Sequence, residues 1–296
     1  MRVDEYKLCA GNLRLGVVPE LGGAVSSLSL LRCGRSIDVL RRSEPEALRT
    51  AGSAQAAMFP MIPFANRLRD NNLAGGTQVV QVRPNVPGQA LCLHGDSWLG
   101  AWKVLDRGPE HLVIEFRSHD EQWPYRYTAE QAFILSDTRL DVRLRVTNDG
   151  ESLPFGLGAH PYFPRDPDTM VRFAAQSVWL EGPDFLPTVV VDPSQVAAFD
   201  PAVVLPDQRL NHCYDGWAGE ALIVHPQRGL SVRMTADPLF GSLMVFTPFD
   251  RPYFALEPQS HTSGAFSTAG TELSKHMLSH GASREGSVHF EVMIDR

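Results

Sequence analysis

Four segments of the sequence combine aromatic or proline residues with polar side chains that can move protons or bind hydroxyl groups. They are residues 59–67 (FPMIPFANR), 93–98 (LHGDSW), 156–163 (GLGAHPYF) and 254–261 (FALEPQSH). Together they supply imidazoles, a carboxylate and an amide next to a guanidinium. An imidazole and a carboxylate are common general acids and bases near neutral pH. If the fold brings the segments together, we expect a site for proton transfer.

The neighbours of these polar residues favour a partly buried site. Prolines stiffen the run that leads to Asn66 and Arg67, and a proline directly follows His160. Tyr162 offers an aromatic face of the kind that suits the apolar C–H face of a sugar. Glu257 ends an apolar, strand-like run, where burial raises the pKa of a carboxyl group. Each segment taken alone is more often structural, so the functional interpretation depends on all four together.

The rest of the chain is dominated by the two-residue alternation of β-strands. Apolar and polar residues alternate over Arg139–Thr147, and Asn-Asp-Gly then supplies a turn. The same alternation recurs over residues 112–116, 230–234 and 288–294. Weak helical patterns are confined to residues 54–58, 195–199 and 272–278. Because glycines and prolines are spread through the chain without a linker, we predict one large antiparallel β-sandwich domain over residues 1–296 with few short helices. The ligand site is expected on strand ends and loops across one face.

Charge and cysteine content exclude several classes of protein. The net charge is −7 and basic residues do not cluster, which argues against nucleic acid or a phosphate-rich substrate. The four cysteines are widely separated, with no Cys-x-x-Cys pair, so we expect buried free thiols rather than disulfides or zinc. Residues 1–9 lack the apolar core of a secretion signal, and no run approaches the ~18 apolar residues of a membrane span. We expect a cytoplasmic protein that binds neither a membrane nor nucleic acid.

Several cofactor and catalytic motifs are missing from the sequence. There is no phosphate-binding Gly-x-x-x-x-Gly-Lys, the Gly156-x-Gly158 pair lacks the third glycine of a dinucleotide fingerprint, and no Gly-x-Ser-x-Gly elbow is present. His276 and His280 have the spacing of a helical metal pair, but Met277 stands where a zinc protease has its glutamate. We expect these two histidines to face solvent, and the protein to need no metal or other cofactor.

In this order, the four segments resemble the aldose 1-epimerase family, whose best known member is galactose mutarotase. The likeness spans nearly the whole chain, from residues 21–24 (LGGA) to 264–266 (GAF). Its most specific pieces are Asn66-Arg67 with the preceding prolines, the GAHPYF run at 158–163, and Glu257-Pro258. Residues 212–217 (HCYDGW) look like the family's loop aspartate beside an aromatic residue. The resemblance implies a galactose mutarotase-like supersandwich that interconverts the α and β anomers of a free aldose.

The resemblance also implies a role for each matched position. Glu257 would be the general base that takes the proton from the anomeric hydroxyl at C1, and His160 the general acid that protonates the ring oxygen. The ring opens, C1–C2 rotates, and the same groups working in reverse close the ring. His94 would hydrogen-bond near the ring oxygen or act as a second proton donor. The residues that would hold the sugar hydroxyls are Asn66, Arg67, Tyr162 and Asp215.

The chemistry of this reaction fits the side chains present. Opening a hemiacetal requires one proton removed and another delivered, with no redox change, phosphate or metal. One well-placed acid or base contributes about 10²–10⁴ in rate, and the reaction already proceeds slowly in water. Glu257 has to be ionised to act as a base, and we expect Arg67 nearby to keep it so. The expected partner is a small monosaccharide, and the expected state a monomer or weak homodimer.

Two departures from the family pattern and three alternatives stay open at this point. The family often has a substrate-binding glutamine upstream of the glutamate, where this chain offers only Thr247, and His261 adds a polar group of unassigned function. A glycoside hydrolase could use Asp215 and Glu257 as a carboxylate pair. A sugar-binding protein without turnover could share the fold. A mutarotase for a hexose 6-phosphate would need further basic residues around the site.

Overall fold

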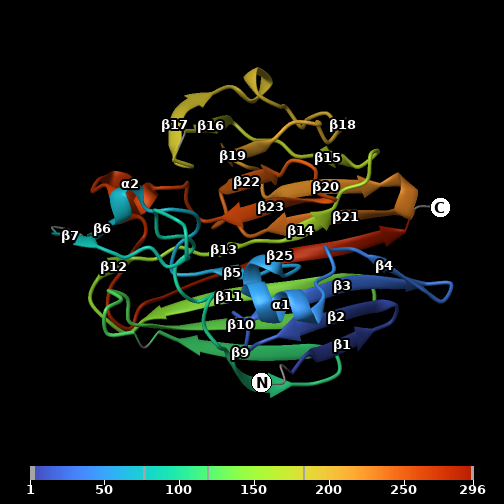
Figure 1. The fold of residues 1–296 in the computed structure, drawn as a ribbon, viewed down its shortest axis with the longest axis horizontal. Helices are drawn as coiled ribbons and strands as arrows, with labels where there is room; N and C mark the ends of the chain where they lie inside the picture. Colours follow the sequence, from blue (N-terminus) through green and yellow to red (C-terminus); the bar gives the residue numbers. More distant parts are fainter. Residues whose placement is uncertain (1–3, 76–77, 119, 183, 295–296) are drawn as a thin grey trace.

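The described part of the chain is built mainly of antiparallel strands in two large sheets (Figure 1). The computed structural model describes residues 4–75, 78–118, 120–182 and 184–294. One sheet has nine strands in the order β18-β15-β20-β21-β25-β11-β10-β9-β8. These strands are β8 (Lys103–Arg107), β9 (His111–Arg117), β10 (Tyr127–Leu135), β11 (Arg139–Asn148), β15 (Met170–Arg172), β18 (Val203–Val204), β20 (Glu220–His225), β21 (Leu230–Ala236) and β25 (Ser283–Ile294). The strands predicted from alternation all belong to this sheet.

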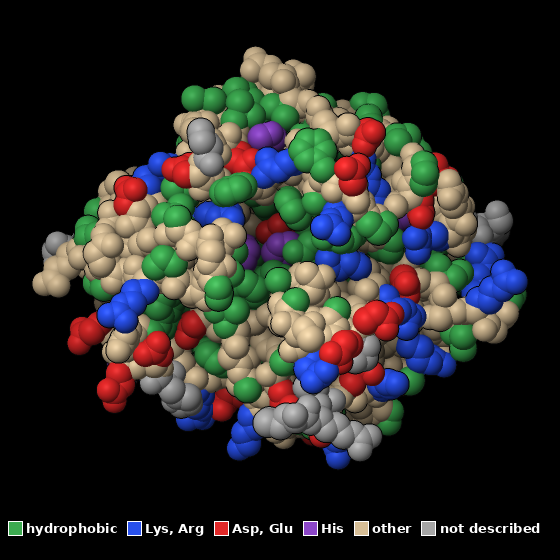
Figure 2. All heavy atoms as spheres, in the orientation of Figure 1, with side chains coloured by type: hydrophobic (Ala, Val, Ile, Leu, Met, Phe, Trp, Pro, Cys, Tyr) green, Lys and Arg blue, Asp and Glu red, His purple; other side chains and the backbone are tan. Residues whose placement is uncertain are grey.

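The second large sheet holds three of the four chemistry-bearing segments. Its order is β17-β16-β19-β22-β23-β13-β5, with β14 also paired to β23. The strands are β5 (Pro60–Met61), β13 (Gly158–Ala159), β14 (Tyr162–Pro164), β16 (Ser177–Glu181), β17 (Pro187–Val191), β19 (Leu210–Asp215), β22 (Ser242–Thr247) and β23 (Tyr253–Gln259). Figure 2 shows a hollow near the centre of the view, over β5, β13, β14 and β23, with acidic and histidine side chains at its floor.

Smaller elements surround the two sheets. The remaining strands form a four-stranded sheet of β1 (Tyr6–Ala10), β2 (Leu13–Val18), β3 (Ala24–Arg32) and β4 (Arg35–Asp38), and two two-stranded sheets, β6 (Asn72–Gly75) with β7 (Gln78–Gln81) and β12 (Leu153–Pro154) with β24 (Met277–Leu278). The helices are α1 (Pro45–Ala51) and α2 (Thr271–Ser274), with the 3₁₀ turns η1 (Gly52–Gln55), η2 (Arg69–Asn71), η3 (Pro193–Gln195), η4 (Pro226–Arg228) and η5 (Ala265–Ser267). The predicted antiparallel β-sandwich with few short helices is therefore confirmed. No helix in the described ranges is long and apolar enough to cross a membrane.

The predicted helical segments overlap the real helices only at their ends. η1, η3 and α2 end at Gln55, Gln195 and Ser274, so each predicted range starts inside a helix and runs past its end. α1 and η3 begin at prolines, whose fixed φ and missing N–H suit the first helical turn. The proline start places η3 earlier in the chain than apolar spacing alone suggests, and α1 lies in none of the predicted ranges. After α2, the chain pairs as β24 instead of continuing as helix.

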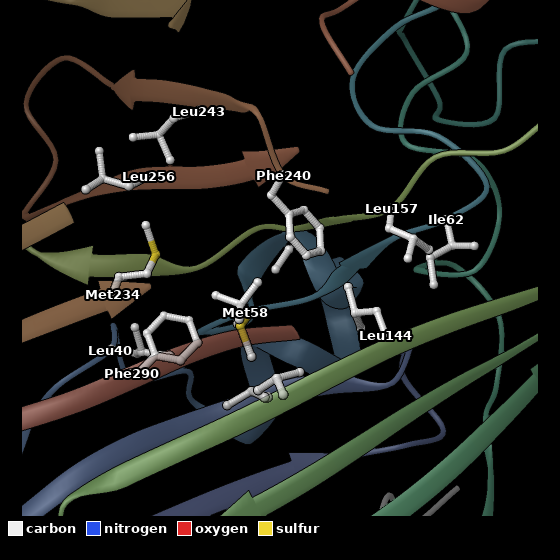
Figure 3. Close-up of a cluster of buried hydrophobic side chains, with 14 of the residues drawn as sticks. Leu40, Met58, Ile62, Leu144, Leu157, Met234, Phe240, Leu243, Leu256 and Phe290 are labelled. Carbon is white, nitrogen blue, oxygen red and sulfur yellow. The ribbon is translucent and has the colours of Figure 1, made fainter. Parts of the chain in front are cut away.

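The hydrophobic core lies between the two large sheets. Leu243 and Leu256 on the eight-stranded sheet point toward Met234, Phe290 and Leu144 on the nine-stranded sheet (Figure 3), and all five are at most 1% exposed. Alternation along β11 and β25 fills this layer, as the sequence predicts. Burial of apolar surface contributes about 25 cal/mol per Å² to the free energy of folding. A continuous apolar layer of this kind therefore supplies most of the favourable free energy of folding.

Two predictions about burial are wrong. The alternation over residues 288–294 predicts that Ile294 is buried, and all four cysteine thiols were expected to be buried. Ile294 is 47% exposed, because β25 runs beyond the start of β11, which faces Glu291, and so loses its cover on that side. All four cysteines are free, but Cys9 and Cys33 are exposed. Cys9 occupies an outward position of β1, and Cys33 lies in the turn between β3 and β4.

Alternation along β23 also separates the core from the site. Phe254 and Leu256 point into the core, so Ala255, Glu257 and Gln259 point to the opposite face of the sheet. A strand with period two therefore supports the sandwich with one set of residues and presents polar groups to the hollow with the other.

Candidate active site

Strand pairing brings the four chemistry-bearing segments together. β13 pairs with both β5 and β23 through Gly158, and β14 pairs with β23 so that Tyr162 faces Ala255. An isolated bridge joins Arg67 to Leu93, which carries the second segment to the same place. Residues far apart in the sequence thus meet over adjacent strand ends.

His160 and Glu257 form the centre of this site. Nε2 of His160 lies 3.1 Å from Oε1 of Glu257, and their side chains are only 8% and 4% exposed. The imidazole also packs against Phe59, with ring centroids 4.5 Å apart. The two side chains expected to act together on one sugar therefore lie in direct contact.

Burial shifts the protonation of both members of this pair toward the uncharged form. Burial raises the pKa of Glu257 to about 8, although a hydrogen bond from Gln259 and the charge of Arg67 act in the opposite direction. Burial lowers the pKa of His160 to about 3, and the charge of Arg41 lowers it further. The expectation that Arg67 keeps Glu257 ionised is wrong, because desolvation of the carboxyl group outweighs the charge of Arg67. Near neutral pH the pair therefore holds one transferable proton, which these two shifts place on Glu257.

Gln259 engages the second oxygen of the glutamate. Its Nε2 donates to Oε2 of Glu257 at 3.1 Å, and both side chains are buried. Oε1 of Gln259 is buried with no hydrogen-bond partner in the described residues. Sequence reasoning assigned Gln259 no function, although its position two residues after Glu257 on a strand places it on the same face.

His94 is held as a neutral hydrogen-bond donor. Its Nδ1 accepts the backbone N–H of Asn66 at 2.9 Å, so the ring proton lies on Nε2. Burial, followed by the charges of His160 and Arg67, lowers the pKa of His94 well below its usual range. Its ring meets that of His160 edge to face, with centroids 5.5 Å apart. Of the two expected roles, the geometry favours hydrogen bonding over proton delivery.

The backbone around His94 needs unusual conformations. His94 and Asn66 both have left-handed φ values, 58° and 60°. Gly95 follows at φ 69°, and a Cβ there would lie 2.4 Å from the carbonyl oxygen of Ile62. The glycine after His94 thus permits the close backbone approach expected from the sequence.

Tyr162 lies beside the central pair and under an arginine that the sequence did not single out. Its hydroxyl is 3.5 Å from Nε2 of His160, and the two rings are 4.5 Å apart. The guanidinium of Arg41 stacks 3.8 Å above the Tyr162 ring and 4.4 Å from that of Tyr253. Arg41 follows no motif in the sequence, and only the tertiary approach of its backbone to β14, where its N–H donates to the carbonyl oxygen of Tyr162 at 2.7 Å, reveals it.

Arg67 reaches the site from the other side and keeps hydrogen-bonding capacity. Its guanidinium stacks on Phe185 at 4.6 Å, and its hydrogen bonds to the described residues are the long contacts of 3.4 Å with Asn66 Oδ1 and Gln89 Oε1. Burial lowers the pKa of Arg67, while the charge of Glu257 acts against that shift. A half-buried guanidinium with spare N–H groups is suited to hydroxyl recognition.

Asp215 lies on the face of the sheet that carries Glu257, but two strands away. It faces Ser242, which in turn faces Gln259, and its Oδ1 accepts a hydrogen bond from Ser242 Oγ at 2.8 Å. Two strand spacings and an offset of two residues separate the backbones of Asp215 and Glu257 by about 12 Å. That spacing does not favour the carboxyl pair of a retaining glycoside hydrolase, which lies about 5–5.5 Å apart, whereas an inverting enzyme uses a wider pair of about 6.5–9.5 Å.

Thr247, which was singled out in the sequence, has a structural role instead. Thr247 points into the core, where its Oγ1 donates to Gln208 O and accepts from Leu210 N–H, each at 2.7 Å. It therefore does not replace the family's glutamine, and the positions of β22 that face the site are Ser242, Met244 and Phe246.

The prediction that His276 and His280 both face solvent is confirmed for His280 and wrong for His276. His280 is exposed, but His276 is half-buried, with Nδ1 2.9 Å from Arg284 and its ring packed on Phe266. His276 lies just after α2, so helical spacing does not apply there. The described ranges contain no cluster of three or more His, Cys, Asp or Glu side chains arranged to hold a metal.

The fold and the site define a β-sandwich protein with a buried imidazole and carboxyl pair on one hollowed sheet face. The chain belongs to the aldose 1-epimerase family, whose sequence pattern matches residues 4–290. It is similar to the uncharacterised Escherichia coli K12 protein YphB, with 34% identity over 270 residues covering 86% of this chain and 88% of YphB. A second uncharacterised protein of that strain, YihR, is 22% identical over 273 residues, which cover 88% of this chain and 85% of YihR.

Solved structures show the same fold. A crystal structure of a candidate aldose 1-epimerase from Escherichia coli K12 has a TM-score of 0.89 and 30% identity, covering 99% of this chain and all of the other. A GalM/aldose epimerase homologue from Caenorhabditis elegans has a TM-score of 0.86 at 14% identity, with complete coverage of both chains. The predicted galactose mutarotase-like sandwich is thereby confirmed.

Proposed function

We propose that this protein interconverts the α and β anomers of a free monosaccharide by opening and closing its ring. The observation that carries the proposal is the 3.1 Å contact between His160 Nε2 and Glu257 Oε1 at the buried centre of the site. The two oxygens of a hemiacetal are bonded to the same carbon. A proton donor and a proton acceptor for those oxygens must therefore lie side by side, and this pair does.

In the proposed reaction, Glu257 takes the proton from the C1 hydroxyl while His160 gives a proton to the ring oxygen. The bond between C1 and the ring oxygen breaks, its electrons go to that oxygen, and C1 becomes an aldehyde carbon. Rotation about C1–C2 turns the other face of the aldehyde to the C5 hydroxyl, and the two proton transfers run in reverse. The pair carries one transferable proton at the start and at the end, so no outside acid or base is consumed.

The surrounding residues would bind and orient the sugar. The Nε2–H of His94 would donate to an oxygen near the ring oxygen, since Asn66 already occupies Nδ1. The spare N–H groups of Arg67 and the hydroxyl of Tyr162 would contact sugar hydroxyls on opposite sides of the pair. Asn66 and Asp215 would contact further hydroxyls from the loop and from the end of β19. Fixed donors of this kind cost little reorganisation during the reaction.

The test is anomer exchange in freshly dissolved α-galactose and α-glucose, followed by polarimetry and by exchange NMR. Wild-type protein should accelerate relaxation, and His160→Ala or Glu257→Gln should each reduce the acceleration about 10²–10⁴-fold. His280→Ala and Glu151→Gln, at exposed positions, are the matched controls and should retain full activity. Equal rates in wild type and both site variants would remove the proposal.

The same assays distinguish the alternatives. Arabinose, xylose, fucose and glucose 6-phosphate in parallel reactions define the sugar. Release of nitrophenol from a nitrophenyl glycoside would favour a hydrolase that uses Asp215 and Glu257. Sugar binding in calorimetry without accelerated anomer exchange would indicate a binding protein.

A further inference from the structure

Two consecutive backbone amides next to Arg67 donate to histidine rings from two different parts of the chain. The N–H of Ala65 donates to Nε2 of His261 at 3.1 Å, and the N–H of Asn66 donates to Nδ1 of His94 at 2.9 Å. Both contacts are buried. A buried amide without a partner is costly, so these two acceptors decide where the segment can lie.

The outer ends of the same segment are also tied to distant residues. The carbonyl of Pro63 accepts from Gly156 N–H at 2.6 Å, and the carbonyl of Arg67 accepts from Gly264 N–H at 3.0 Å. Residues 63–67, which we name the clamped loop, are therefore held along their length. Glu257 lies four residues before His261, which ties this loop to the strand that carries the proposed base.

The hydrogen bonds of His261 fix its tautomer. Its Nδ1 lies 2.9 Å from the carbonyl oxygen of Thr262, which can only accept. The ring proton is therefore on Nδ1, and the lone pair of Nε2 is free to receive Ala65 N–H. His94 has the opposite arrangement, with the proton on Nε2.

Packing leaves the ring of His261 little freedom to move. It stacks on Phe266 with centroids 4.1 Å apart. On another side it touches Gly156, where a Cβ atom would lie 2.3 Å from the ring. A residue larger than glycine at position 156 would thus displace the imidazole from the clamped loop.

We propose that His261 is a positioning residue, whose neutral imidazole sets the clamped loop, and with it Asn66 and Arg67, at a fixed place relative to Glu257. His261 itself need not touch the sugar. The kinetic part of this inference rests on the proposed function, whereas the tautomer and the amide contact can be measured without any substrate.

Imidazole ¹⁵N NMR of the uniformly labelled full chain tests the geometry. Between pH 6 and 8 we expect His261 to be protonated at Nδ1 and His94 at Nε2, and the amides of Ala65 and Asn66 to exchange slowly with solvent. A proton on Nε2 of His261 would overturn the inference, because that nitrogen could then not accept from Ala65.

Kinetics with three variants test the consequence for substrate binding. His261→Phe keeps a ring but removes the acceptor, and we expect KM for the preferred sugar to rise about tenfold or more with a smaller change in kcat. His261→Gln offers a carbonyl oxygen near the position of Nε2 and should restore most of the affinity. His276→Phe is the matched control, since His276 lies in the same aromatic cluster but hydrogen-bonds Arg284.

The possible results separate the two proposals. A folded His261→Phe protein with unchanged KM would overturn the positioning role. If wild type relaxes no sugar, the proposed function fails, and the NMR result alone then decides whether His261 holds the loop. Because the NMR measurement uses wild type, poor folding of a variant does not leave the inference undecided.

Discussion

The proton shared by His160 and Glu257 decides how activity should depend on pH. The reaction requires a protonated imidazole and an ionised carboxylate together, which is one of the two arrangements in which the pair holds one transferable proton. Burial raises the pKa of Glu257 to about 8. Above that pH the pair loses its proton, leaving a carboxylate and a neutral imidazole, so the acid is missing. We predict that kcat falls about tenfold per pH unit above pH 8, after subtraction of the uncatalysed rate.

Stopped-flow polarimetry between pH 6 and 10 measures this alkaline limb. Gln259→Leu sharpens the test, because the hydrogen bond from Gln259 lowers the pKa of Glu257 and its loss should move the limb to higher pH. Gln195→Leu, at an exposed position, should leave the limb unmoved. A rate that rises through pH 8 would instead show that Glu257 works as a base beside a neutral His160.

Individual residues differed in how visible they were in the sequence. His160, Glu257, His94 and Asn66-Arg67 could be predicted because each stands in a short run with a distinctive order of residue types. Gln259 could have been found by applying strand alternation from Glu257. Arg41 could not, because its stacking on Tyr162 depends on two segments that have no sequence relation to each other.

At the scale of elements, strand register decides which residues can take part in the site. A shift of one residue would exchange every core residue of β22 with a site residue. The register places Met244 opposite Glu257, and thereby turns Thr247 toward the core. Residue type alone could not show this, since a threonine suits either face of a strand.

Thr247 therefore provides a prediction about stability rather than activity. Thr247→Val keeps the shape of the side chain but leaves Leu210 N–H and Gln208 O without their buried partner. We expect the free energy of unfolding to fall by about 1–3 kcal/mol, with KM and kcat of the folded protein unchanged. Urea denaturation and anomer exchange on the same sample measure both quantities. A changed KM at unaltered stability would show that Thr247 faces the sugar after all.

The elements themselves were predicted unevenly, for physical reasons. Long strands such as β11 and β25 have one buried face, so alternation marks them clearly in the sequence. β5 and β13 have two residues each and are buried on both faces, so no alternation exists to find. These short strands hold the site together. They can be recognised as strands only from their pairing with neighbouring strands in the structure.

For the whole molecule, the two-sheet sandwich, its large core and its hollowed face follow from composition and alternation, while the position of the hollow does not. That position depends on pairings between β5, β13 and β23. These strands are so far apart in the sequence that no local pattern indicates their pairing. The expectations of one domain, of a monomer or weak homodimer and of a cytoplasmic location stay predictions. Size-exclusion chromatography with light scattering would measure the oligomeric state.

The buried glutamate also has a consequence for the stability of the whole molecule. The pKa of Glu257 is near 4.5 in an unfolded chain and about 8 in the folded one. Between these pH values the folded protein holds a proton that the unfolded chain has lost, so the free energy of unfolding declines as pH rises and levels off above pH 8. The full shift corresponds to at most about 5 kcal/mol.

Glu257→Gln should remove this dependence, because an amide does not ionise and can still accept from Gln259. We predict that the variant equals wild type in stability near pH 4.5 and becomes progressively more stable toward pH 8, while losing activity. Urea unfolding at pH 5, 6.5 and 8.5 measures the difference. A stability difference that stays constant across this range would show that the folded protein does not hold Glu257 protonated. A difference in the free energy of unfolding that grows with pH would mean that burial of Glu257, which raises its pKa for proton transfer, reduces the stability of the fold.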